Sequence, residues 1–254
     1  SSDQMVVSVN PVPTVTVTPS APAVCNGLGV ALNVSSSPAG ATFSWIPSGS
    51  LSSSSGSSVT ATPGTTTSYT VTGTIASTGC SSSTPVTVTV HPNPTVTVPA
   101  IAPICPGGSV SLTATANGGQ TPYTYAWSPT GGLSSATGQT VNASPPGTTS
   151  YTVTATDARG CKGSTNTTVT VNQTPTVNAG NDVLVCNVPT AYAMSGYSPA
   201  GGTWSGTGVS ANGNFTSPGV GTYTLTYTLT QNACTGSDQV VVTVINPSAA
   251  DAGP

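Results

Sequence analysis

Apolar and polar side chains alternate along most of this chain. The clearest runs lie at residues 151–154, 168–171 and 223–229, where Val, Leu or Tyr alternates with Thr. In a β-strand, successive side chains point to opposite faces, so a period of two puts the apolar residues on one face and the hydroxyls on the other. Clusters of Gly, Pro, Ser and Thr separate the runs and are typical of turns. The pattern predicts an all-β chain of short, half-buried strands.

The same order of features recurs about every 80 residues, which indicates tandem repeats. Each unit carries a Cys, an alternating strand, a Trp, a Tyr-led strand and a second Cys before a closing strand. We predict Ig-like repeats at 12–92, 93–173 and 174–247, the third shortened between its first Cys and its Tyr. About seven strand signals per unit favour Greek-key β-sandwiches. Short linkers with prolines predict an extended rod.

The two ends of the chain echo the inside of the repeats. Residues 2–11 are a near copy of 237–247, where the third repeat closes. We therefore expect 1–11 to be the last strand of a preceding repeat, or else a donor strand for a neighbouring subunit. Residues 248–254 resemble the opening of the third repeat and are expected to begin a following one.

Large aromatic residues recur at one place in each repeat and predict the three cores. A buried Trp removes much apolar surface from water and stabilises a small sandwich. The expected core residues are Trp45, Trp127, Trp204, Tyr69, Tyr151 and Tyr223.

Two cysteines in each repeat predict disulfides and an oxidising compartment, because no Cys-x-x-Cys pair accompanies them. They are Cys25, Cys80, Cys105, Cys161, Cys186 and Cys234. We favour pairing within repeats, each bridge closing a loop of about 50 residues and contributing roughly 4 kcal/mol. In a standard sandwich, however, the two cysteines of one repeat lie at opposite poles. The second scheme therefore pairs Cys25 with Cys161 and Cys105 with Cys234 across the joints, and leaves Cys80 and Cys186 for flanking repeats or subunits.

Several motifs resemble a known family. Repeats one and two share Cys-x-Gly-x-x-Val-x-Leu, Trp-x-Pro, a Pro/Thr turn before Tyr-Thr-Val-Thr, then Gly-Cys and a terminal Thr-Val-Thr-Val. This series resembles the PKD-like and Ig-like tandem repeats of large Bacteroidota cell-surface proteins, including gliding-type adhesins. The resemblance implies export to the cell surface, by the type IX route, and a spacer or adhesive role. It implies no catalytic activity.

The charge and the scattered polar residues exclude several function classes. Two Lys+Arg against five Asp+Glu give no basic surface for nucleic acid, and no apolar run is long enough for membrane insertion. No catalytic set, metal site or cofactor site can be assembled: His91 is a lone linker residue, and the acids are scattered. Asp157 and Asp182 lie in turns, where we weigh a weak calcium site against the commoner turn-stabilising role.

These observations predict a non-enzymatic structural segment of an extracellular or cell-surface adhesin stalk or filament, stiffened by disulfides. Its expected partner is itself, since long β-rich surfaces of low charge favour association at strand edges. The alternative is a polysaccharide-binding or accessory module of a secreted hydrolase. In that alternative the sugar contacts are exposed aromatics such as Tyr123, Tyr125, Tyr192 and Tyr197.

Overall fold

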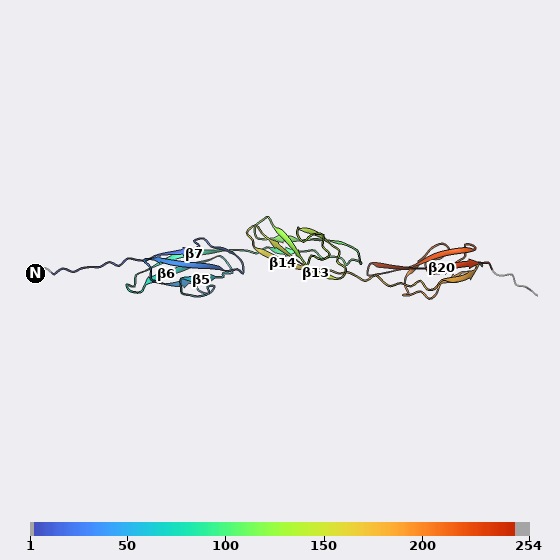
Figure 1. Cartoon of the computed structure of the whole chain (residues 1–254), viewed down its shortest axis with the longest axis horizontal. Helices are drawn as coiled ribbons and strands as arrows, with labels where there is room; N and C mark the ends of the chain where they lie inside the picture. The colour runs from blue at the N-terminus through green and yellow to red at the C-terminus, as the bar shows by residue number, and fades with distance from the viewer. Residues whose placement is uncertain (1–2, 247–254) are drawn as a thin grey trace, which may run out of the picture.

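The computed structural model describes residues 3–246 and contains 20 β-strands within them. Three small β-domains follow one another along a single long axis, with the N-terminal segment extending from one end (Figure 1). No helix long and apolar enough to cross a membrane occurs in this part of the chain. The predicted all-β fold is confirmed, and the domains form the extended row expected from the linkers. The predicted start of a further repeat at 248–254 lies outside the described residues.

The first domain has seven strands in two sheets. One sheet has the order β1-β3-β5 and the other β2-β7-β6-β4, and every pair is antiparallel except β2 with β7. This arrangement is a Greek-key Ig-like sandwich. The strands are β1 (Thr14–Thr18), β2 (Ala23–Cys25), β3 (Val30–Ser37), β4 (Ala41–Ile46), β5 (Ser58–Ala61), β6 (Thr67–Ile75) and β7 (Ser81–His91).

The second domain repeats this plan with shorter pairings. Its strands pair as β8-β10, β9-β12 and β11-β13-β14, and a parallel bridge between Ile104 and Val171 replaces the β2–β7 ladder. The strands are β8 (Thr95–Thr97), β9 (Val110–Thr113), β10 (Thr115–Asn117), β11 (Thr124–Ser128), β12 (Thr140–Ala143), β13 (Thr149–Thr156) and β14 (Lys162–Val169).

The third domain keeps the larger sheet and reduces the smaller one. Its larger sheet has the order β15-β20-β19-β17, with β15 parallel to β20, and its smaller sheet contains only β16 and β18. The strands are β15 (Val183–Cys186), β16 (Tyr192–Ala193), β17 (Thr203–Ser205), β18 (Asn214–Phe215), β19 (Gly221–Gln231) and β20 (Cys234–Ile245).

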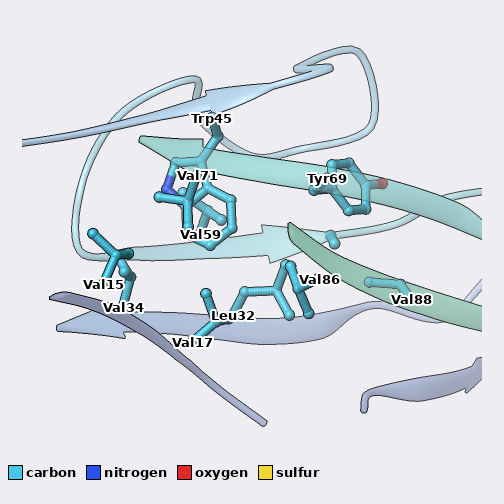
Figure 2. Packing of buried hydrophobic residues seen from close by; sticks show 11 residues of the cluster. Val15, Val17, Leu32, Val34, Trp45, Val59, Tyr69, Val71, Val86 and Val88 are labelled. Atoms are coloured by element: carbon cyan, nitrogen blue, oxygen red, sulfur yellow. The ribbon is translucent and has the colours of Figure 1, made fainter. Parts of the chain in front are cut away.

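Each domain has its own hydrophobic core, built around its Trp. Figure 2 shows Trp45 beside Val59 and Val71, which come from the two facing sheets. Trp45, Trp127 and Trp204 are at most 4% exposed, as the repeat pattern predicts. The hydroxyl groups of Tyr69 and Tyr151 bond to Ser50 and to the Gly131 carbonyl, so these buried phenols remain hydrogen-bonded.

The third core differs from the prediction at Tyr223, which is only partly buried at the edge of the cluster. Trp204 pairs across the sheet with Tyr227, in the register where Trp45 faces Val71 and Trp127 faces Val153. The position equivalent to Tyr69 and Tyr151 is therefore Leu225. A shift of two residues along a strand keeps the same face inward, so alternation alone does not reveal it.

The segment that enters each domain passes close over the strand that follows the second Cys. In the first domain the Ser82 hydroxyl donates a hydrogen bond to the Pro13 carbonyl. The matching positions are Gly163 and Gly236, where an added Cβ would lie 1.7 Å and 2.2 Å from the carbonyl oxygens of Pro94 and Pro175. These two crossings leave no room for a side chain.

We expect Gly163→Ala to destabilise the second domain by about 2 kcal/mol or more, because its methyl group would overlap the Pro94 carbonyl. Gly147→Ala is the matched control in the same domain, since a Cβ there meets no atom within 4 Å. Chemical denaturation of both variants checks the prediction. Equal stability of the two would contradict the close crossing.

Candidate functional site: the disulfide-braced joints

The two cysteines of one domain lie at opposite ends of its last strand. Cys25 ends β2 and pairs with His91 at the far end of β7, while Cys80 immediately precedes β7. The 11 residues of β7 span about 35 Å. A disulfide needs Cα atoms about 6 Å apart. The within-repeat pairing favoured from the sequence is therefore wrong.

The structure instead joins neighbouring domains. Cys25 bonds to Cys161 and Cys105 bonds to Cys234, with Cα–Cα distances of 5.4 and 5.5 Å. In both bridges the first Cys of a domain bonds to the second Cys of the next domain. These bonds connect residues 136 and 129 positions apart, so each spans a joint.

Side-chain amides add a second connection at each joint. The amide nitrogen of Asn93, in the first linker, donates to the Asn26 carbonyl at 3.0 Å, one residue after Cys25. At the second joint, Asn172 donates to the Asn232 carbonyl at 2.8 Å, two residues before Cys234. Every joint therefore combines a short linker, a disulfide and an amide hydrogen bond. Rotation and bending between adjoining domains are restricted by all three.

A buried carboxylate shapes the turn that carries Cys161. Asp157 is 5% exposed, and its carboxylate accepts backbone N–H groups of Gln120, Arg159 and Cys161 at 2.8–2.9 Å. Burial opposes ionisation, but these three N–H donors and the nearby Arg159 charge outweigh it and hold the pKa of Asp157 below its usual value. Of the two alternatives weighed from the sequence, the turn-stabilising role fits these contacts.

The other two domains build this turn differently. In the second domain the backbone N–H of Asp157 donates to the Cys161 carbonyl. In the first domain the backbone N–H of Ile75 donates to the Cys80 carbonyl in the same way, but Ile75 has no carboxylate to accept further bonds. In the third domain Asn232 and Ala233 form a two-residue hairpin with φ of 48° and 64°, directly before Cys234. Positive φ at both central residues is typical of tight hairpins. Turns that differ in their side chains and length thus present the second Cys at the same pole.

The remaining predicted residues form no reactive group. His91 is the last residue of β7 rather than a linker residue. Asp182 accepts a hydrogen bond from the Val241 backbone N–H, and Asp238 accepts one from Ala179. Within residues 3–246, no group of three His, Cys, Asp or Glu side chains is placed to hold a metal ion.

The tyrosines considered as sugar contacts are partly buried instead of exposed. Each packs against the core of its own domain because it lies on the inward side of its strand or loop. Tyr197, for example, stacks edge-on against Trp204 at 5.6 Å between ring centroids. The four residues are Tyr123, Tyr125, Tyr192 and Tyr197.

Comparison with known proteins identifies the family of these domains. The family described as "Ig-like domain CHU_C associated", a Bacteroidota-type domain, matches residues 11–94 and 92–175. The chain belongs to this Ig-like family. The two matched Ig-like domains contain Cys25, Cys80, Cys105 and Cys161. No curated protein matches the chain.

Solved structures that match include tandem Ig domains. They include the eight N-terminal Ig domains of Down Syndrome Cell Adhesion Molecule (12% identity, TM-score 0.47) and the titin I-band fragment I67–I69 (11%, 0.41). Three N-terminal domains of the bacteriophage RB49 outer capsid protein Hoc also match (14%, 0.39). These alignments cover 92–93% of this chain, but 37% of the first structure and 100% of the other two.

We expect the double variant Cys25→Ser/Cys161→Ser to lose stability and stiffness at the first joint. The bridge closes a 136-residue loop, which the chain-entropy model values at about 5 kcal/mol when both domains unfold together. Calorimetry should show a lower melting temperature, and X-ray scattering should show a wider range of particle lengths. Cys80→Ser, which breaks no bridge in this chain, is the control. Identical melting and scattering of the double variant and the control would contradict the bracing role.

We expect acid to destabilise the second domain through Asp157. Because the folded state lowers its pKa, the unfolded state binds the proton first, so stability is lost as pH falls below about 3.8. Asp157→Asn should reduce this loss between pH 4 and pH 2, measured as the shift in denaturation midpoint. The first domain, with Ile75 at this position, provides the internal control. An unchanged pH profile in the variant would contradict the role of Asp157.

Proposed function

We propose that this chain is a non-enzymatic structural segment of an extracellular adhesin stalk or filament, which holds other parts away from the cell surface. The observation that carries the proposal is the pairing rule of the two disulfides, each of which joins one domain to the next. A bond of this kind adds nothing to a site inside a domain. It stabilises the orientation between domains, which is the property that a rigid spacer requires.

The composition supports an extracellular location. Disulfides persist in oxidising compartments, and here they connect domains that already have separate cores. Only two Lys+Arg occur in 254 residues, so trypsin-like proteases find few sites. The Bacteroidota-type family and the resemblance to gliding-type adhesins support a surface protein exported by the type IX route.

The two disulfide loops overlap, and this overlap supports a tensile role. Residues 26–160 lie within the first loop and 106–233 within the second. A pulling force applied at the two ends follows the shortest covalent path, which crosses both bridges and contains only roughly 100 residues. The fully extended length at roughly 3.5 Å per residue is then about 350 Å, against about 890 Å for the reduced chain.

Pulling single molecules by their ends tests this function. We expect the oxidised chain to stop extending at less than half the length reached after reduction, with Cys80→Ser behaving like the parent. A chain that extends equally with and without reductant would argue against a tensile stalk. The polysaccharide-binding alternative has no supporting observation, since its candidate tyrosines are partly buried.

A further inference from the structure

Cys80 and Cys186 are the two cysteines without a disulfide partner in the described chain. Their positions are not equivalent to each other. Cys80 is the second Cys of the first domain, like Cys161 and Cys234, whereas Cys186 is the first Cys of the third domain, like Cys25. Both bridges join a first Cys to the second Cys of the next domain, so Cys186 and Cys80 are complementary under the same rule.

The backbone around Cys186 matches that around the bridged Cys25. Cys186 ends β15 and pairs in parallel with Ile245, as Cys25 ends β2 and pairs with His91. The next residue in each domain donates to the paired carbonyl, Asn187 to Ile245 at 2.7 Å and Asn26 to His91 at 2.9 Å. Unlike Cys25, Cys186 is exposed and unbridged.

Cys80 likewise lies in the setting of a bridged second Cys. The chain entering the first domain passes beside it, with the Asn10 carbonyl 4.0 Å from its sulfur and Pro13 against Ser82. In the second domain the chain enters over the same place, with Pro94 against Gly163, two residues after the bridged Cys161. Cys80 is therefore the counterpart of Cys161 in its place relative to the entering chain, and the same rule pairs it with the first Cys of a domain placed before it.

Apolar side chains are exposed on the segment that enters the first domain and beside Cys186. The N-terminal segment exposes Val6 by 89% and Val9 by 87%, although its near copy in β20 buries three of its four valines. At the other end of the rod, Leu184 is 65% exposed and lines a pocket with Cys186 and Val188. At the first joint, the pocket beside Cys25 is completed by Gly160 and Lys162 of the next domain.

We propose that Cys186 of one copy of this chain forms a disulfide with Cys80 of a second copy placed end to end, which continues the joint pattern. The inference extends the proposed function, since it gives the stalk or filament a covalent way to lengthen. In this arrangement Cys186 faces the first domain of the second copy, whose turn between β6 and β7 carries the complementary cysteine.

The bond forms by thiol–disulfide exchange with a low-molecular-weight disulfide such as oxidised glutathione. The Cys186 thiolate attacks one glutathione sulfur, forming a mixed disulfide and releasing one glutathione thiolate. The Cys80 thiolate then attacks the Cys186 sulfur and releases the second. The two protein thiols lose two electrons and two protons, and one glutathione disulfide becomes two glutathione thiols.

Two single-cysteine variants of the full chain test the complementarity. Cys80→Ser keeps only Cys186 free, and Cys186→Ser keeps only Cys80 free, so a mixture can form one heterodimer and two homodimers. With one variant isotopically labelled and oxidised glutathione as the oxidant, we expect at least tenfold more heterodimer than either homodimer. Non-reducing peptide mapping should recover Cys186 linked to Cys80. A statistical mixture of the three dimers would overturn end-to-end pairing of separate copies.

Two copies fused into one tandem polypeptide test whether Cys186 and Cys80 can pair when the two domains are already held next to each other. In it, residues 1–247 of one copy continue directly into residues 12–254 of a second, because 2–11 and 237–247 are near copies. A Cys186–Cys80 link that forms in this tandem but not between separate copies would overturn the proposal for separate copies and would restrict the pairing to consecutive repeats of one polypeptide. Its absence there would overturn the inference. If the bridges Cys25–Cys161 and Cys105–Cys234 are recovered in the same digest, the stalk proposal stands independently.

Discussion

A short parallel pairing between the second strand and the last strand controls where each joint is locked. The pairing of β2 with β7 holds Cys25 at the end of the domain where the chain leaves. The parallel Ile104–Val171 bridge does the same for Cys105, and the β15–β20 pairing does so for Cys186. The second Cys sits at the opposite end, before the last strand begins. The length of that strand forbids a bond within the domain. Because each bridged Cys lies at an end of its domain that faces a neighbour, the distance to that neighbour's Cys is short enough for a bond.

Much of this fold could be predicted from the sequence because its signals are local. Alternation of Thr with Val, Leu or Tyr gives the strands, and the recurrence of Trp45 and Trp127 about 80 residues apart gives equivalent cores. The alternation reflects the pleat of a single strand, and the recurring Trp reflects the volume needed to fill one core. Neither property depends on the neighbouring domain. The family match to the first two repeats agrees with them.

The remaining features depend on tertiary geometry. Cysteine spacing is compatible with both pairing schemes, and only the position of Cys25 relative to the whole of β7 decides between them. Tyr223 and Tyr227 share an inward face, so a period of two does not tell which one meets Trp204. Tyr197 reads as a surface aromatic in its Gly- and Pro-rich segment, yet its ring packs onto Trp204.

The overlap of the two covalent rings has a consequence for survival outside the cell. Any single backbone cut between residues 26 and 233 falls inside at least one ring, so the two fragments stay bonded through Cys25–Cys161 or Cys105–Cys234. A surface protein accumulates such nicks during its lifetime. Here one nick anywhere in that region leaves the molecule in one piece, and whatever is attached at its far end is retained.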